Sequence, residues 1–227
     1  MTTQSLGQVA PELLLDFATG AVSEPVALAL ATHASLNNEA AADLARLNQV
    51  GGALLETEMG SDINESALDA LLDRLDDEPA LVARPAFDDE TKAIIPEPLR
   101  GYLPSSLKDL NWRRSTAGVE EADLLVPHGQ DNAADGADYR VALLRIEPGR
   151  EVPQHTHRGQ ELTVVLDGSY CDAENCFRRG DIEIADGDTD HAPLADAVTG
   201  CLCLIVMDAP LKLTGPIGRW LNPFIKY

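Results

Sequence analysis

The stretch GREVPQHTHRGQELTVVLDG, residues 149–168, contains two histidines two positions apart and a glutamate four positions after the second. On an extended chain, residues i and i+2 point to the same side, so His155 and His157 can converge on one point. Glu161 can reach the same point if the chain turns at residues 158–160. This pattern favours a metal site over a hydrophobic core.

A closed metal site needs a fourth donor, and His191 is the one histidine downstream of this stretch. It follows GDIEIADGDTD, which reads as a strand that ends in a Gly- and Asp-rich turn. Three imidazoles and one carboxylate suit zinc, iron, manganese, nickel or copper. Four protein ligands in a tetrahedron would indicate a structural zinc, whereas open coordination positions would indicate oxygen chemistry or isomerisation.

The quoted stretch resembles the first cupin motif position for position, from Gly149 through the two histidines and Glu161 to Gly168. The second cupin motif is present in a weaker form, with Gly180 and His191 at the right spacing. The resemblance implies an antiparallel double-stranded β-barrel that holds one divalent metal on the three histidines and the glutamate.

The remainder of the chain divides into a helical part and a strand-rich part, which predicts an α+β fold. Helices are expected at 11–19, 24–36, 39–58 and 68–75, and short strands at 122–127, 139–148, 161–170, 181–186 and 201–207. Prolines and charged residues crowd the region between the two parts. We therefore predict a helical domain at 1–77, a Pro-rich linker at 78–104 and a cupin domain at 105–227.

The chain has a formal net charge of -21, and residues 1–90 carry 17 acidic against 3 basic side chains. Such an excess argues against direct nucleic-acid binding and against anionic membrane surfaces, and it is compatible with a basic protein partner. We find no apolar run long enough for a spanning helix and no signal-peptide pattern, so we expect a cytoplasmic protein.

A helical N-terminal domain, a Pro-rich linker and a single-metal cupin together resemble the ChrR-type anti-sigma factors, across almost the entire chain. The resemblance implies a transcription regulator rather than an enzyme. Its helical domain would hold an extracytoplasmic-function sigma factor. Its cupin domain, with zinc as the expected metal, would be needed for release under oxidative stress of the singlet-oxygen type.

The sequence departs from that family at the zinc site of the N-terminal domain. There the family has a histidine followed by cysteines at +4 and +7, whereas this chain has His33, Asn37 and Ala40, and Gln8 stands at the upstream histidine position. Asn and Ala cannot replace two thiolates. We therefore expect no N-terminal zinc and treat His33 as an ordinary helix residue, which leaves sigma binding to be tested.

The four cysteines lie in the C-terminal third of the chain. Cys201 and Cys203 share one face of a strand, which fits either a redox pair or two small buried side chains. Cys171 and Cys176 flank a hairpin turn, where they can face each other or remain ordinary thiols; we expect ordinary thiols.

Two other functions fit the same residues. The first is a metal-dependent cupin enzyme, a dioxygenase, isomerase or decarboxylase, with an accessory helical domain. The second is a protein whose helical domain mediates self-association, as in a homodimer. Open metal positions that face a pocket would favour the enzyme, and a saturated zinc would count against it.

Overall fold

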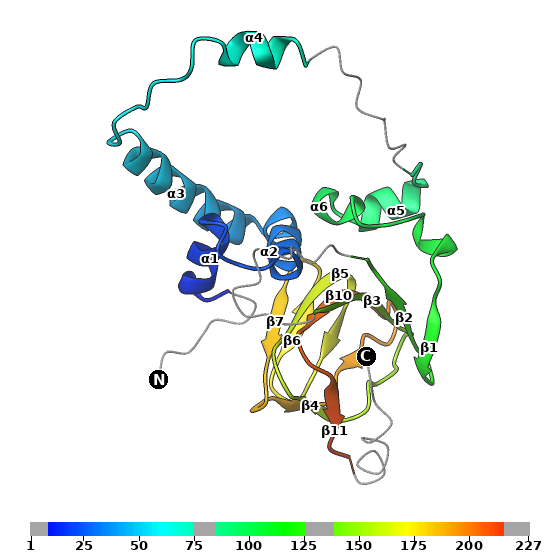
Figure 1. Ribbon diagram of the computed structural model, residues 1–227. Coiled ribbons are helices and arrows are strands. Elements are labelled where there is room, and N and C mark those ends of the chain that lie inside the picture. Colours follow the sequence, from blue (N-terminus) through cyan, green and yellow to red (C-terminus); the bar gives the residue numbers. More distant parts are fainter. Residues whose placement is uncertain (1–8, 75–84, 126–138, 216–227) are drawn as a thin grey trace.

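The computed structural model describes residues 9–74, 85–125 and 139–215 (Figure 1). Helices form the N-terminal part and an antiparallel β-barrel forms the C-terminal part, which confirms the α+β prediction. None of the described helices combines the length and the hydrophobicity that a membrane span requires.

The four helices expected at the N-terminus are present: the second has the expected bounds, and the other three end one to three residues earlier than expected. They are α1 (Pro11–Ala18), α2 (Glu24–Leu36), α3 (Asn38–Leu55) and α4 (Ala67–Leu72). Proline in the first turn of α1 and of α2 suits the fixed φ angle of that position. α1 and α2 pack close to the barrel, whereas α3 and α4 form an arch that projects away from it (Figure 1).

The region expected to be an irregular linker contains regular structure from residue 89 onward. Helices α5 (Asp89–Ile94) and α6 (Glu97–Arg100) are followed by a 3-10 helix, η1 (Leu107–Asp109). Ile95 and Leu99 are fully buried, and Leu103 is nearly so. The prediction of an irregular chain is therefore wrong for this part: one of its prolines opens α6, and the apolar residues between the prolines dock on the barrel.

The barrel consists of short antiparallel strands. They are β1 (Arg113–Thr116), β2 (Val119–Asp123), β3 (Arg140–Ile146), β4 (His155–His157), β5 (Glu161–Cys171), β6 (Cys176–Arg178), β7 (Ile182–Ala185), β8 (Asp190–His191), β9 (Leu194–Ala195), β10 (Cys201–Met207) and β11 (Leu211–Leu213). The larger sheet runs β1-β2-β3-β10-β5-β6, with β7 and β9 also paired to β5. A second sheet, β11-β4-β8, forms the part that carries the histidines.

The central strand β10 is buried along its whole length because both of its faces are covered. Leu202, Leu204 and Val206 belong to the core between the sheet and the helices. Cys203 and Ile205 belong to the second core, inside the barrel. This arrangement explains the unbroken apolar run CLCLIVM, since alternation is lost when neither face meets water.

The turn between β6 and β7 connects the barrel to the helices. Nδ1 of His33, on α2, lies 2.7 Å from the carbonyl oxygen of Gly180 and donates to it, since that oxygen only accepts. The guanidinium of Arg179 donates to the carbonyl oxygens of Ala93 and Ile94, on α5. Gly180 has a φ of 91°, which few L side chains adopt. This turn therefore anchors α2, which precedes the expected linker, and α5, which lies within it.

Candidate metal centre

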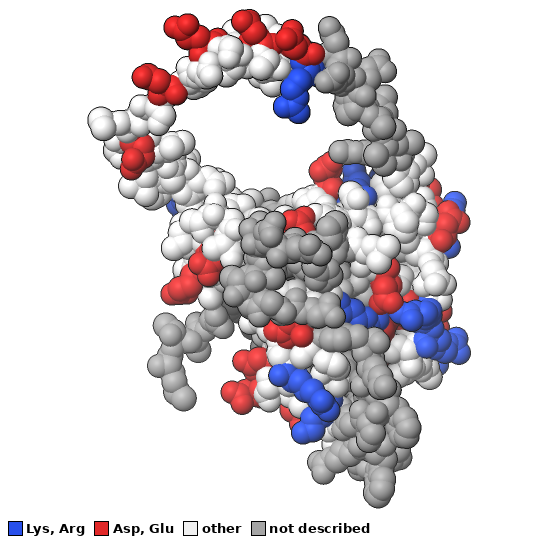
Figure 2. Space-filling model, viewed as in Figure 1, with Lys and Arg blue, Asp and Glu red and all other residues white. Residues whose placement is uncertain are grey.

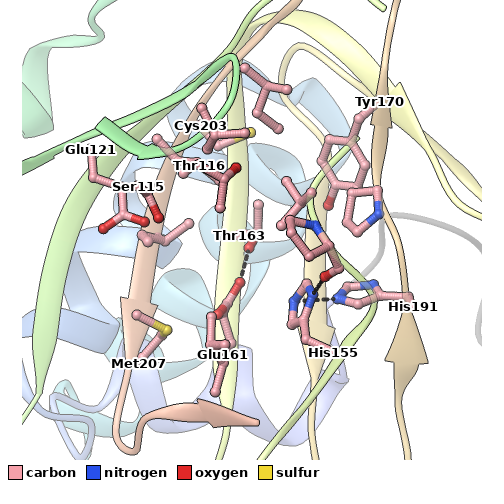
Figure 3. Close-up of a pocket in the computed structure, with 18 of the residues that line it drawn as sticks. Ser115, Thr116, Glu121, His155, Glu161, Thr163, Tyr170, His191, Cys203 and Met207 are labelled. Atoms are coloured by element: carbon pink, nitrogen blue, oxygen red, sulfur yellow. Dashed lines mark hydrogen bonds between the residues drawn. The ribbon is translucent and has the colours of Figure 1, made fainter. Parts of the chain in front are cut away.

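His155, His157 and His191 meet on one side of the barrel interior. His155 and His157 are alternate residues of β4, and His155 pairs with His191 of the neighbouring strand β8. All three side chains are buried. In Figure 3, His155 and His191 point toward each other at the wall of a cavity. The structure thus brings together the three histidines that the sequence predicts, and this group can hold a metal ion.

The neighbours of two rings fix which nitrogen carries the proton. The carbonyl oxygen of Pro153 lies 2.8 Å from Nδ1 of His155 and can only accept, so this Nδ1 is the donor. The Glu183 carboxylate lies 3.1 Å from Nδ1 of His191 and likewise favours a proton there. When these two rings are neutral, their Nε2 atoms carry lone pairs that face one point, which is the arrangement of a metal site.

The separations of these nitrogens fit a metal ion. Nε2 of His191 lies 3.2 Å from Nε2 of His155 and 3.3 Å from Nε2 of His157. A tetrahedron built on Zn–N bonds of about 2.0–2.1 Å has edges of about 3.3–3.4 Å. Two nitrogen lone pairs that face each other at this distance do not attract each other. A cation between them would be stabilised by both. The three histidines therefore fit the group that the cupin motif implies.

The electrostatic environment keeps the His155 and His157 rings neutral and favours a positive charge at His191. Burial lowers the pKa of His155 to about 4 and that of His157 to about 3. Burial also acts to lower the pKa of His191, but the contact with Glu183 and the charges of Glu183, Glu161 and Asp172 outweigh it, so that pKa is raised. His155 and His157 are therefore unprotonated at neutral pH, and the carboxylates near His191 favour a positive charge there, whether a proton or a metal ion.

Glu183 was not singled out by the sequence, yet it supports His191 directly. Its second carboxylate oxygen accepts a hydrogen bond of 2.5 Å from the hydroxyl of Tyr170. Burial and this carboxylate raise the pKa of Tyr170 well above its usual value, which keeps the hydroxyl a donor. A chain from Tyr170 through Glu183 to His191 resembles the outer contacts that orient metal-binding histidines in general.

Glu161, the predicted fourth ligand, lies beside the three histidines rather than among them. One of its oxygens lies 3.5 Å from Nδ1 of His157, and the other accepts a 2.9 Å hydrogen bond from Thr163. Burial raises the pKa of Glu161 to about 7. Its carboxyl group points into the cavity (Figure 3), where a bound cation would favour the charged form. Its role as a ligand stays a prediction.

A cavity of about 530 Å³ occupies the barrel interior next to His155 and His191. Its lining is mainly apolar, with residues such as Leu144, Ile205 and Met207. Arg140, at its edge, is engaged by Glu121 at 2.6 Å and by Asp123 at 2.7 Å. Among the described lining residues, this leaves no uncommitted arginine or lysine for an anionic substrate.

The possible redox pair Cys201 and Cys203 lies deep in the barrel. Their Sγ atoms are 3.4 Å apart, and both side chains are buried and not joined by a disulfide. The hydrogen bond with Cys201 and burial raise the pKa of the Cys203 thiol well above its usual value. Because the thiolate is the reactive form, this environment favours the packing interpretation; a redox role stays a prediction.

Cys171 and Cys176 correct the expectation of ordinary thiols. They pair directly across the β5–β6 hairpin and form a disulfide. The short turn between them brings the two strands into register, so that both Cβ atoms leave the same side of the hairpin. A hairpin with cysteines at both ends of its turn is the signal that could have predicted this bond.

The residues at the positions expected for the family's N-terminal zinc site make other contacts in this structure. His33 is buried and contacts Gly180. The side chain of Asn37 accepts hydrogen bonds from the backbone N–H groups of Glu39 and Ala40, which caps the start of α3. Asn37 thus stabilises a helix terminus at a position where we expect the family to have a thiolate. Gln8 lies outside the described residues.

Comparison with known proteins places this site in a family. Residues 105–210 match a family described as the ChrR cupin-like domain. The anti-sigma-E factor ChrR of Cereibacter sphaeroides is 36% identical over 218 residues, which cover 96% of this chain and 97% of that protein. The crystal structure of Rhodobacter sphaeroides SigE in complex with the anti-sigma ChrR matches with a TM-score of 0.72 and 35% identity, over 90% of this chain and 100% of that chain.

The two matches to ChrR each cover at least 90% of the chain, so they include both the helices and the barrel. The predicted fold and the predicted family are both confirmed. The chain belongs to the family of ChrR-type anti-sigma factors, whose C-terminal part is a cupin-like barrel.

Proposed function

We propose that this protein is an anti-sigma factor that holds an extracytoplasmic-function sigma factor through its N-terminal helices and binds one zinc ion in its cupin barrel. The observation that carries the proposal is the full-length match to ChrR, which has been crystallised in complex with SigE. The protein is then a regulator of transcription rather than an enzyme. It acts where RNA polymerase acts, in the cytoplasm.

The arch formed by α3 and α4 offers the surface for the sigma factor. Its apolar side chains are unusually exposed: Val50 59%, Leu54 63%, Leu55 73% and Leu71 59%. Exposed apolar side chains gathered on one part of a surface often mark interaction sites. Acidic side chains flank them along the arch (Figure 2). A partner with apolar pockets and a basic rim would match both features.

Zinc fits the histidine geometry, because the two Nε2 spacings at His191 match the edges of a tetrahedron. His155, His157 and His191 would hold the ion, with Glu161 as the fourth ligand. A zinc ion with four protein ligands would supply a fixed structural charge inside the barrel. Oxidation near this centre is then the signal that we expect to loosen the hold on the sigma factor.

The docking surface is tested with the full chain and the sigma factor of the same organism, by size-exclusion chromatography at low salt. Leu54→Asp combined with Leu71→Asp should abolish the one-to-one complex. Leu125→Asp is the matched control, because Leu125 is 93% exposed on the barrel part of the chain. Binding by the double variant with wild-type affinity would show that the arch is not the docking surface.

A metal-dependent cupin enzyme is the second candidate, and the cavity beside His155 and His191 is the observation that favours it. X-ray absorption spectroscopy of the metal-loaded protein separates the two. Exchangeable water on the metal would favour the enzyme, and four protein ligands would favour the regulator.

A further inference from the structure

The β5–β6 hairpin places a cysteine pair within reach of solvent and close to the metal centre. Cys176 is exposed and Cys171 is half-buried. The two other cysteines, Cys201 and Cys203, are both buried. A small thiol or disulfide can therefore reach the hairpin pair more readily than Cys201 and Cys203, which are 4% and 0% exposed.

Asp172 connects this hairpin to the metal centre. One carboxylate oxygen accepts hydrogen bonds from the backbone N–H groups of Glu174, at 2.8 Å, and Asn175, at 2.6 Å, which closes the turn. The other oxygen lies 3.7 Å from Nδ1 of His191. The Asp172 side chain is only 8% exposed. The turn that the two cysteines enclose thus presents a carboxylate to a ring of the metal centre.

The hairpin also opens onto a groove that it shares with α1. Cys171 and Asp172 line this groove together with Leu13 of α1 and His191. Many of the other lining groups are acidic, among them Glu12, Asp16, Asp188 and Asp190. The acidic lining lowers the rate at which anionic reagents approach. The thiol–disulfide equilibrium itself is set by the two sulfur atoms and their surroundings.

We propose that Cys171 and Cys176 are a redox-active pair that exchanges with small-molecule thiols and disulfides, and that closure of their disulfide tightens metal binding at His155, His157 and His191. The second part rests on the metal site proposed above. The first part stands on the hairpin alone.

The exchange balances in two steps. The thiolate of Cys176, the exposed partner, attacks one sulfur of a small-molecule disulfide, which breaks that bond and releases one thiolate. The thiolate of Cys171 then attacks the Cys176 sulfur of the mixed disulfide, which forms the hairpin bond and releases the second thiolate. Two protein thiols are oxidised, one small disulfide is reduced to two thiols, and the two released thiolates take up the cysteine protons.

The link to the metal runs through Asp172. With the disulfide closed, the ends of β5 and β6 are tied and the turn holds Asp172 against His191. With two free thiols, the turn gains freedom and the ring loses part of its support. Contacts of this outer kind change metal affinity by about 10- to 100-fold, so we expect the disulfide form to bind zinc about tenfold more tightly. Zinc must then shift the thiol–disulfide equilibrium by the same factor.

The test uses the full chain equilibrated in glutathione buffers of varied ratio, with acid quenching, alkylation and mass spectrometry of the peptide that holds residues 171–176. Without zinc, we expect both forms to interconvert as the ratio changes while Cys201 and Cys203 stay reduced. A pair that never forms the disulfide, or one that excess reduced glutathione cannot open, would overturn the redox assignment.

The same titration at a fixed free zinc concentration tests the link. Zinc should favour the disulfide by about tenfold in the wild type, and Asp172→Asn should keep the exchange but lose the shift. An unchanged equilibrium, or a shift toward the dithiol because zinc binds the thiolates, would overturn the link. Failure of both forms to bind zinc would overturn the metal site and the link together, while the zinc-free titration still judges the pair.

Discussion

Replacing Glu183 by glutamine tests how the barrel orients its metal-binding histidines. The Glu183 carboxylate lies 3.1 Å from Nδ1 of His191 and accepts a 2.5 Å hydrogen bond from Tyr170, and its side chain is 10% exposed. Glutamine keeps the shape and removes the charge. Loss of such an outer contact lowers metal affinity by about 10- to 100-fold. This corresponds to about 1.4–2.7 kcal/mol of binding free energy.

The structure gives the physical reason for this range. The contact with Glu183 and its charge are the main causes that raise the pKa of His191 against the effect of burial. Without the Glu183 charge, burial lowers the pKa of His191 with less compensation. A negative charge that stabilises a proton on the ring also stabilises a metal cation beside it, so its removal weakens metal binding. Asp172 and Glu161 remain, so we expect a weakened site rather than a lost one.

The assay is a competition titration with a chromophoric zinc chelator at pH 7.5, with the wild type and Glu120→Gln measured in parallel. Glu120 is the matched control because it also loses one negative charge from the barrel. It pairs with Arg145 at 3.6 Å and is not among the residues that line the cavity. The reasoning is refuted if Glu183→Gln binds zinc within twofold of the wild type, or if Glu120→Gln loses as much affinity.

Three further predictions concern stability. Gly180→Ala should lower the free energy of unfolding in urea by at least about 1–2 kcal/mol, because φ is positive and the new Cβ would lie 2.9 Å from the carbonyl oxygen of Leu36; Gly101→Ala, where that Cβ meets open space, should lower it little or not at all. Burial lowers the pKa of His33, so as pH falls below 6.5 the unfolded chain takes up a proton that the folded chain does not, and stability is lost. His33→Gln should remove this loss. In metal-free protein, the difference in unfolding free energy between wild type and variant should therefore narrow as the pH falls from 8 to 5. A difference that stays constant would contradict a buried, neutral His33 ring. Removal of zinc by a chelator should lower the melting temperature in calorimetry, and readdition should restore it; an unchanged melting temperature would count against a metal bound to the folded state.

The sequence predicts the barrel and the histidine group because both depend on short-range patterns. Residues 149–168 contain two ligands at a spacing of two, which a strand turns to one side, and the run CLCLIVM has the length and composition of a buried strand. The position of His191 could be inferred from the second cupin motif. The structure confirms that it pairs with His155 across β4 and β8.

The parts that the sequence could not predict depend on contacts between distant segments. Glu183 and Asp172 are two of 38 acidic residues, and only the pairing of β5 with β6 and β7 brings them to His191. We interpreted the prolines around α5 and α6 as breaks in regular structure. A proline in the first turn of a helix is tolerated, whereas one further along interrupts the helix, and the sequence alone does not say where the helix begins. The burial of Ile95 against the barrel settles which of these occurs.

In the helical part, Asn37 and His33 make contacts that need no metal. Asn37 caps α3 with hydrogen bonds of 3.0 and 3.1 Å, and His33 ties α2 to the β6–β7 turn of the barrel. A cap contributes about 1 kcal/mol, far less than a structural zinc of about 10 kcal/mol or more. Without a zinc there, packing against the barrel would have to hold the helices, which is why we expect Gly180→Ala to affect them.

The most direct test of the central claim is a calorimetric titration of the full chain with the extracytoplasmic-function sigma factor of the same organism, followed by transcription with purified RNA polymerase. We predict one-to-one binding with a dissociation constant below one micromolar and loss of transcription from the promoter of that sigma factor. Absence of heat at micromolar concentrations in low salt, with transcription unchanged, would contradict the assignment.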